Sequence, residues 1–239
     1  MYTTTLLSSK TIAEGTMEFR FAKPEGFTFT AGQSIDLFLV DPQETDAEGN
    51  KRAYSLASAP GEQELSIATR MRDTAFKRVL KSLPMGAMVE VDGPFGSFFL
   101  HEKASRPAVF LAGGIGITPF RSMLLDSIDR KLLHRIQLFY SNRRPEDAAY
   151  LSELQALVSV QNPNFMFIPT MTNMEHSAQA WSEERGYVDA TMLERYVSRD
   201  TQPIYYLAGP IGMVTAMRTQ LTGLGVSADD IRFEEFSGY

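Results

Sequence analysis

Residues 112–119, which read Ala-Gly-Gly-Ile-Gly-Ile-Thr-Pro, constrain the fold of this chain more than any other stretch. They follow an apolar run over residues 107–111, which predicts a buried strand because the run offers no polar face to water. Gly113, Gly114 and Gly116 permit positive φ and let a ligand approach the backbone without a Cβ in the way. We therefore expect a strand that ends in a tight glycine turn.

The residues after this turn predict the start of a helix. We expect Thr118 to cap the helix and Pro119 to occupy its first position, where no backbone N–H is needed. The free N–H groups and the positive dipole end of such a helix form an anion-binding site. The simpler alternative is a tight turn between a core strand and a core helix.

Strands and helices alternate from here to the end of the chain. This alternation predicts a five-stranded, parallel, doubly wound α/β domain that binds ligands at the carboxyl ends of its strands. The expected strands are residues 107–112, 136–141, 164–170, 203–208 and 231–236, and the expected helices are residues 118–130, 146–158, 190–198 and 211–223.

The first part of the chain has a different pattern. Short alternating runs such as residues 17–21 and 34–40 are separated by glycines and prolines, which predicts an antiparallel β-barrel. We expect an acidic loop over residues 41–51 and one helix over residues 74–83. The fold class is thus β plus α/β, with a barrel domain over residues 1–103 and an α/β domain over residues 104–239.

The composition excludes several kinds of binding partner and metal site. The 239 residues carry a net charge of −6 and include no cysteine, so we expect no nucleic-acid partner and no cysteine-ligated zinc or iron–sulfur cluster. The three histidines, His101, His134 and His176, are far apart in the sequence, and we expect no metal site. Redox chemistry in this chain therefore requires a bound organic cofactor.

Targeting signals are not evident in the sequence. No apolar run approaches the ~20 residues of a membrane span, and the first residues lack the basic and apolar regions of a secretory signal. We expect a cytoplasmic protein without a membrane span, and a monomer.

The segment Arg52-Ala53-Tyr54-Ser55 opens a predicted strand after the acidic loop. Arginine can pair with phosphate through two hydrogen bonds, tyrosine offers a flat amphipathic face, and serine can donate or accept. Arg52 and Tyr54 share one face of the strand because side chains alternate along it. By itself, the segment is more typical of a surface strand with a packed tyrosine.

Five motifs in order give the chain a resemblance to the ferredoxin–NADP reductase superfamily of flavoenzymes, and this resemblance covers nearly the whole sequence. The motifs are Arg52-Ala53-Tyr54-Ser55, Gly93-Pro94-Phe95-Gly96, the glycine turn at residues 113–119, Ala208-Gly209-Pro210 and the terminal Glu234-Glu235-Phe236-Ser237-Gly238-Tyr239. The resemblance implies a flavin-binding barrel, a pyridine-nucleotide domain and a flavin between them.

The resemblance also implies roles for single residues. Arg52 would neutralise a flavin phosphate, Tyr54 would lie against the flavin, and Ser55 would reach its N5 region. Glu234 would lie near the nicotinamide pocket, and Phe236 would cover the flavin ring. The expected catalytic residues are Ser55, Glu234 and Phe236. The expected flavin-binding residues are Arg52, Ala53, Tyr54, Ser55, Thr69, Arg70, Thr74, Lys77, Phe236 and Tyr239, and the expected pyridine-nucleotide-binding residues are Gly113, Gly114, Gly116, Thr118, Pro119, Asn142, Arg143, Arg144, Gly209, Pro210 and Met213.

The chain departs from the family pattern at two places. Thr74-Ala75-Phe76-Lys77 stands where the family has Gly-x-x-Ser for the flavin pyrophosphate, which leaves FAD and FMN both open. We favour FAD because Arg52, Thr74 and Lys77 together can hold a pyrophosphate. Ala208 stands where many relatives have a cysteine beside the nicotinamide.

The coenzyme is open between NADPH and NADH. Thr170-Met171-Thr172 lacks the Ser-Arg pair of plant-type NADP enzymes. Arg143 and Arg144, however, follow the second strand of the α/β domain, where a ribose phosphate would lie, and arginine suits a phosphate. We expect a slight preference for NADPH and some use of both coenzymes. The alternative is that the two arginines belong to a solvated loop balanced by Glu146 and Asp147.

The resemblance implies an FAD-dependent NAD(P)H oxidoreductase that passes a hydride from NAD(P)H to FAD and then single electrons to a separate acceptor. A locally basic cluster favours an acidic carrier, ferredoxin or flavodoxin, as that acceptor, unless the cluster is only a solvated helix face. Its members are Arg70, Arg72, Lys77, Arg78 and Lys81. Two other functions stay open, a reductase of small acceptors (free flavin, ferric chelates or quinones) and a non-catalytic flavin- or nucleotide-binding subunit.

Overall fold

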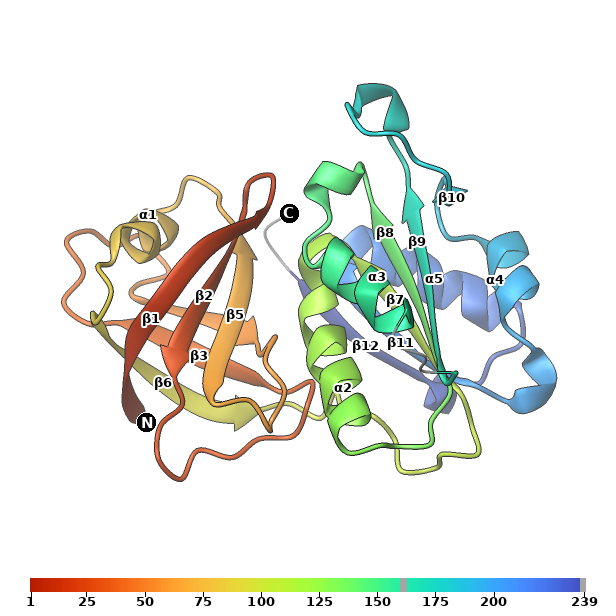
Figure 1. Ribbon diagram of the computed structural model, residues 1–239, viewed down its shortest axis with the longest axis horizontal. Helices are drawn as coiled ribbons and strands as arrows, with labels where there is room; N and C mark the ends of the chain where they lie inside the picture. Colours follow the sequence, from red (N-terminus) through yellow and green to blue (C-terminus); the bar gives the residue numbers. More distant parts are fainter. Residues whose placement is uncertain (160–162, 237–239) are drawn as a thin grey trace.

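Two sheets lie side by side in the computed structural model, which describes residues 1–159 and 163–236 (Figure 1). The first sheet consists of β1 (Tyr2–Ala13), β2 (Thr16–Ala22), β3 (Ser34–Leu39), β4 (Lys51–Ser55), β5 (Glu64–Arg70) and β6 (Met88–Phe95), in the order β4-β3-β6-β1-β2-β5. All its pairings are antiparallel, and β1 pairs with β6 at its start and with β2 further on. The sheet therefore curls into the predicted barrel.

The helix expected over residues 74–83 is α1 (Ala75–Ser82), which packs against the barrel. Its buried side chains, Phe76, Val79 and Leu80, join the apolar core inside the barrel. The helix begins at Thr74, whose hydroxyl accepts a hydrogen bond from the Lys77 N–H at 3.4 Å. A threonine at this position stabilises a helix because it satisfies one of the N–H groups of the first turn.

The second sheet is parallel and has six strands. They are β7 (Ala108–Gly113), β8 (Ile136–Asn142), β9 (Phe165–Met171), β10 (Glu184–Arg185), β11 (Ile204–Pro210) and β12 (Ile231–Phe236), in the order β10-β9-β8-β7-β11-β12. The fold class is therefore confirmed, with one strand more in the parallel sheet than the sequence predicted. The additional strand, β10, has two residues, which is too short to produce a period in the sequence.

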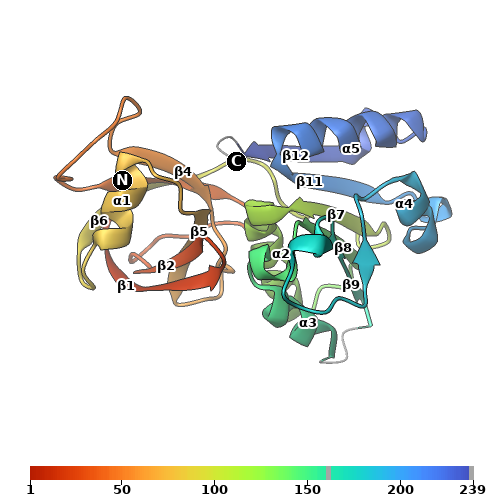
Figure 2. The same ribbon diagram turned by 90° about the horizontal axis from the view of Figure 1, so that it is seen from above.

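Helices cover both faces of the parallel sheet, as Figure 2 shows. On one face α2 (Ile117–Asp129) and α3 (Leu151–Ser159) join the core through Phe120 and Leu154. On the other face α4 (Ala190–Tyr196) and α5 (Ile211–Gly223) join a separate core through Leu193 and Val214. Within residues 1–159 and 163–236, the chain forms no helix that is both long and apolar enough to cross a membrane.

One helix boundary differs clearly from the prediction. We expected a helix from residue 146, but α3 begins at Leu151 because Pro145–Asp147 forms a separate 3₁₀ turn. Arg144 holds this turn, since its guanidinium contacts both carboxylate oxygens of Asp147 at 2.9 Å.

The barrel and α2 are joined by polar contacts at the edge of a shared apolar core. Arg121 of α2 donates to the Ala57 carbonyl at 2.7 Å, and the Ser122 hydroxyl donates to the Ser58 carbonyl at 2.6 Å. The core itself includes Ala57 of the barrel side and residues of α2 in one cluster. These contacts fix the position of the parallel sheet relative to the barrel.

A buried carboxylate makes a second connection between the two sheets. The side chain of Glu18 in β2 is fully buried, and it accepts hydrogen bonds from Arg20 at 3.0 Å and from the Tyr150 hydroxyl at 3.0 Å. Burial alone raises the pKa of Glu18, but Arg20, Lys10 and Tyr150 outweigh it and lower that pKa below its usual value. The ionised carboxylate therefore stabilises the fold at neutral pH, and this contribution is lost on acidification.

We expect Tyr150→Phe to destabilise the protein by about 1–3 kcal/mol, because Glu18 keeps its buried charge and loses one donor. Urea unfolding at neutral pH measures this loss. Tyr187→Phe is the matched control, since Tyr187 is 79% exposed and its loss should change stability by less than about 0.5 kcal/mol. Equal unfolding midpoints for Tyr150→Phe and the unaltered protein would show that this contact contributes nothing to the connection.

Candidate functional site

The glycine turn after β7 packs directly against β11. A Cβ on Gly116 would lie 2.2 Å from the Ala208 carbonyl oxygen, and a Cβ on Gly113 would lie 2.3 Å from Met213 Sδ. A Cβ on Gly209 would in turn lie 3.1 Å from the Gly113 backbone. Gly113, Gly209 and Met213, which we expected to share a nucleotide site, therefore lie together at the carboxyl end of the sheet.

The reason for glycine differs from the expectation at two positions of the turn. All three glycines were expected to permit positive φ, but of the three only Gly114 adopts it, at 50°. Gly113 and Gly116 have φ values of −114° and −59°. They are glycine because any side chain would collide with β11 or with Met213, and not because of their own dihedral angles.

The start of α2 also differs from the expectation. Thr118 does not cap the helix, because α2 begins at Ile117 directly after a 3₁₀ turn and Thr118 is its second residue. The Thr118 hydroxyl donates to the Ile115 carbonyl at 3.2 Å. Pro119 is the third helical residue, still within the first turn, where a missing N–H costs no intrahelical bond. Within the described residues no side chain caps α2, which suits an anionic group there.

Asn142, the last residue of β8, shows that a polar group belongs at this end of the sheet. Its side chain is 5% exposed. Within the described part of the chain, neither its amide oxygen nor its amide nitrogen has a hydrogen-bond partner. Buried polar atoms without partners are rare and unfavourable, so Asn142 fits a site that a polar ligand completes.

The two arginines after β8 have different surroundings. Arg144 contacts Asp147 at 2.9 Å and Glu14 of the barrel side at 2.8 Å. Carboxylates of the protein therefore neutralise its charge, which agrees with the alternative that this arginine belongs to a charge-balanced loop. Arg143 is exposed at the carboxyl end of the sheet. Glu146 accepts hydrogen bonds from the Ser177 hydroxyl at 2.9 Å, and its pKa is lowered most by its own backbone N–H, with the charge of Arg144 contributing.

Ser55 and Glu234 meet between the two sheets although 179 residues separate them in the sequence. The Ser55 hydroxyl, at the end of β4, donates to a carboxylate oxygen of Glu234 in β12 at 3.3 Å. Gly96 lies beside them, since a Cβ there would be 3.7 Å from Glu234 Oε1. Burial raises the pKa of Glu234 to about 7, and the Ser55 hydrogen bond only partly opposes this. Glu234 therefore changes its charge near neutral pH.

The end of β12 brings Phe236 to the same region. In the parallel register Glu234 pairs with Ala208 and Phe236 pairs with Pro210, the last residue of β11. Tyr239, expected to share the cover of the flavin ring, lies outside the described residues.

Arg52 and Tyr54 share one face of β4, as their spacing predicts, and both contact Phe76 of α1. The Arg52 guanidinium lies 5.0 Å from the Phe76 ring centroid, and the Tyr54 ring lies 6.3 Å from it. Burial raises the pKa of the Tyr54 hydroxyl, with Thr69 and Arg52 opposing the shift. Ala53 faces the other way and is exposed.

The start of α1 gathers the other residues expected at the flavin phosphate. Thr74 caps the helix, and the Lys77 ammonium donates to the Arg70 carbonyl at 2.6 Å. Thr69 and Arg70 are the last residues of β5, next to this helix. The structure thus brings Arg52, Thr74 and Lys77 together on one side of the barrel.

The partners of Arg52 were not predicted from the sequence. Its guanidinium contacts Asp46 at 2.6 Å and Glu48 at 3.0 Å. Both belong to the acidic loop that directly precedes Arg52, and this closeness in the sequence was the available signal. Carboxylates, and not only a ligand, are therefore partners of this arginine.

The acidic loop also neutralises part of the basic cluster that we expected to dock a carrier. Arg78 pairs with Glu44 at 2.6 Å and with Asp73. Arg72 and Lys81 are exposed members of the cluster. The cluster is therefore less basic than its sequence implies, because the loop over residues 41–50 folds toward α1.

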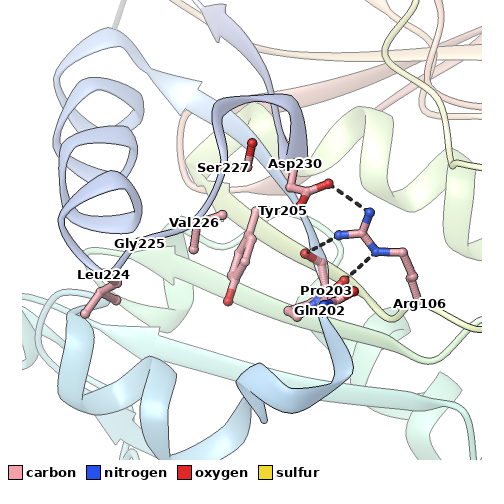
Figure 3. Close-up of a pocket in the computed structure, with 9 residues that line it drawn as sticks. All are labelled: Arg106, Gln202, Pro203, Tyr205, Leu224, Gly225, Val226, Ser227 and Asp230. Atoms are coloured by element: carbon pink, nitrogen blue, oxygen red, sulfur yellow. Dashed lines mark hydrogen bonds and ion pairs between the residues drawn. The ribbon is translucent and has the colours of Figure 1, made fainter.

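A separate pocket of about 340 Å³ lies at the opposite end of the parallel sheet (Figure 3). It forms where β11 starts and α5 has ended, with Tyr205 and Val226 among its lining residues. Arg106 in this pocket donates to the Gln202 carbonyl at 2.5 Å and pairs with Asp230 at 2.9 Å. The donors of Arg106 thus hold neighbouring segments together, away from the glycine turn.

Comparison with known proteins agrees with this geometry. The family described as oxidoreductase NAD-binding domain matches residues 110–219, which include the glycine turn and the start of α5. Ferredoxin–NADP reductase B of Sorangium cellulosum is 32% identical over 228 residues, which cover 92% of this chain and 90% of that protein. The reductase component of phenol 2-monooxygenase from a Pseudomonas species is 31% identical over 211 residues, 87% of this chain but 58% of that protein.

Solved structures have the same fold over nearly the whole chain. A cytochrome P450 reductase from Amycolatopsis has a TM-score of 0.82 at 25% identity, covering 98% of this chain and 69% of that one. A ferredoxin–NADP⁺ reductase from Neisseria gonorrhoeae, solved with bound FAD and NADP, has a TM-score of 0.82 at 22% identity, covering 98% of both chains. With a relative that is 32% identical and matches along nine-tenths of its length, this chain belongs to the ferredoxin–NADP reductase superfamily of flavin-dependent NAD(P)H oxidoreductases.

Proposed function

We propose that this oxidoreductase transfers a hydride from NADPH to FAD and then passes single electrons to a separate protein carrier, ferredoxin or flavodoxin. The observation that carries the proposal is the contact between Ser55 and Glu234 at 3.3 Å. This contact joins β4, the strand that carries Arg52, to β12, which pairs with the strand that packs against the glycine turn. A flavin held by the barrel and a nicotinamide held by the parallel sheet would therefore meet at one place.

Each of the two domains would hold one cofactor. Residues 1–103 hold FAD through Arg52, Tyr54, Thr74 and Lys77, and residues 104–239 hold the pyridine nucleotide at the carboxyl ends of β7, β8 and β11. FAD supplies the redox chemistry, because a flavin takes up two electrons and releases them one at a time. The protein supplies position and charge.

Glu234 supplies a charge next to the reacting groups, and Ser55 orients its carboxylate. Above a pH of about 7 the Glu234 carboxylate is ionised, and the Ser55 hydroxyl donates a hydrogen bond to Oε2 and keeps that oxygen in place. A negative charge at this position stabilises the positive charge that nicotinamide acquires when it loses a hydride. Phe236, at the end of the same strand, excludes water from the site.

The preference for NADPH rests on Arg143, with Asn142 completing the polar site beside it. Arg143 is exposed at the end of β8, where a 2′-phosphate would gain a charged donor. Arg144 does not contribute, since Asp147 and Glu14 hold it.

A protein carrier as the acceptor agrees with the names of the relatives. The Sorangium relative is named a ferredoxin–NADP reductase, and the Pseudomonas relative is named a reductase component. Arg72 and Lys81 are exposed near α1, and we propose them as contacts for an acidic carrier. Association through these charges should slow as the salt concentration rises.

An anaerobic absorbance titration tests the proposal. The purified protein is loaded with FAD and titrated separately with NADPH and NADH, and we expect NADPH to bleach the flavin band at the lower concentration. Adding oxidised ferredoxin or flavodoxin should restore the band. A bound flavin that neither nucleotide bleaches would make the chain a binding subunit, and restoration by quinones or ferric chelates alone would make it a reductase of small acceptors.

The charge of Glu234 should set the pH dependence of flavin reduction. We expect the rate measured by stopped-flow absorbance to rise as pH passes through about 7, the pKa of Glu234, because only the carboxylate stabilises the nicotinamide charge. Glu234→Gln should remove this rise and slow reduction at high pH by about tenfold, equivalent to ~1.4 kcal/mol. Its exposed neighbour provides the control, and Glu235→Gln should keep the original profile. A Glu234→Gln profile identical to that of Glu235→Gln refutes the role.

Arg143 should set the coenzyme preference. Arg143→Ala should reduce kcat/KM for NADPH by about tenfold or more relative to NADH, because a charge-assisted hydrogen bond to the 2′-phosphate contributes roughly 1.5–3 kcal/mol. Steady-state kinetics with both coenzymes measure the ratio. Arg130→Ala serves as the control, since Arg130 follows α2 at the far end of the sheet and pairs with Asp126 of that helix. An unchanged ratio in Arg143→Ala rejects this residue as the determinant.

A further inference from the structure

The acidic loop over residues 41–50 places a carboxylate on the arginine that we propose for the flavin phosphate. Asp46 lies 2.6 Å from Nη2 of Arg52 and also accepts the Glu48 N–H at 3.1 Å. The Arg52 hydrogen bond lowers the pKa of Asp46 most; burial opposes it, and the backbone N–H groups of Glu48 and Phe76 lower the pKa further. Phe76 is in the first turn of α1. Asp46 thus uses an arginine and a helix N–H, which are the donors that bind phosphate oxygens.

Arg52 keeps little donor capacity for a ligand while the loop holds it. A guanidinium has five N–H donors. In Arg52, Nη1 donates to the carbonyls of Glu48, Gly49 and Lys51 at 3.2, 3.1 and 2.6 Å. Nε contacts the Glu48 carboxylate at 3.0 Å, and Nη2 contacts Asp46. One Nη2 proton at most remains, so a phosphate can accept two parallel hydrogen bonds from Arg52 only after a carboxylate has moved away.

A phosphate that binds at Arg52 therefore has to displace interactions that the protein already makes. The observed affinity of a site is reduced by the fraction of molecules that are competent to bind. If the loop leaves Arg52 in about one molecule in ten, the observed Kd lies about tenfold above the intrinsic Kd of the open site. The carboxylates of the loop thus act on flavin binding as an internal competitor.

We propose that Asp46 and Glu48 compete with the flavin phosphate for Arg52, so that the loop over residues 41–50 weakens flavin binding and releases Arg52 when flavin binds. The competition rests on the proposed function, because it requires the flavin phosphate beside Arg52. It acts on FAD and FMN alike, since both flavins present negatively charged phosphate oxygens to the same donors. The loop before the Arg52 motif thereby sets how readily the barrel exchanges its flavin.

Flavin affinity measures this competition without any turnover. The full-length protein is stripped of flavin and titrated with FAD, with FMN and with riboflavin, and the quenching of flavin fluorescence gives each Kd. We expect the double variant Asp46→Asn, Glu48→Gln to bind FAD and FMN about tenfold more tightly, equivalent to ~1.4 kcal/mol. Riboflavin should show no gain, because it has no phosphate. Unchanged or weaker binding of FAD, or an equal gain for riboflavin, overturns the competition.

Amide hydrogen exchange follows the loop itself. Saturation with FAD should speed exchange over residues 41–50, because Arg52 then no longer donates to the carbonyls of Glu48 and Gly49 and the loop opens more often. Equal or slower exchange over these residues in the FAD-saturated protein would mean that the loop stays in place or closes over the flavin, which contradicts its release.

Two further variants separate the possible failures. Glu44→Gln is the matched control, because Glu44 belongs to the same loop but pairs with Arg78, and it should leave the FAD affinity unchanged. Adding Arg52→Ala to the double variant should cancel its gain, since the gain passes through Arg52. If Arg52→Ala weakens FAD binding in that background although the double variant shows no gain, the competition is refuted and the flavin site stands. If Arg52→Ala changes nothing there, the phosphate is not at Arg52 and the proposed site is wrong as well.

Discussion

The attachment of α2 to the barrel is the constraint on which the candidate site depends. Arg121 and Ser122 donate to the carbonyls of Ala57 and Ser58 at 2.7 and 2.6 Å, directly after the strand that ends in Ser55. Since α2 also follows the glycine turn, one helix fixes the anion-binding end of the parallel sheet and the end of β4 together. Ser55 and Glu234 are far apart in the sequence, so their contact depends on this arrangement of the barrel and the parallel sheet.

Glu18 and Glu234 are both shielded from water, yet their pKa values shift in opposite directions. Burial raises the pKa of both Glu18 and Glu234. Glu18 has Arg20, Lys10 and the Tyr150 hydroxyl around it, and these donors keep it ionised and make it part of the connection between the sheets. Among the described residues, Ser55 alone opposes the effect of burial on Glu234, so its pKa stays at about 7. The two carboxylates thus differ in pKa because different hydrogen-bond donors and cations surround them.

The acidic loop neutralises two of the basic residues near α1. Arg52 and Arg78 both carry carboxylate partners from this loop, at 2.6 Å in each case. A count of charges in the sequence treats these arginines as available to phosphate or to a carrier protein. Because carboxylates and backbone carbonyls already accept from most of the Arg52 donors, fewer of its N–H groups are available to a ligand than the sequence implies.

The sequence by itself determined the fold class and the order of most elements, and it predicted the candidate site residues. Hydrophobic periodicity and glycine positions predicted the barrel, the parallel strands and α1 to within a few residues, because these signals are local. What only the tertiary structure decided depends on contacts between distant segments: the short edge strand β10, the pairing of Arg144 with Glu14, and the packing of Gly113 and Gly116 against β11. A single residue's neighbours across the fold set its charge and its steric limits, and no local pattern contains them. The sequence therefore predicts which residues lie near the candidate site, whereas the packing of the two sheets decides which of them remain available to a ligand.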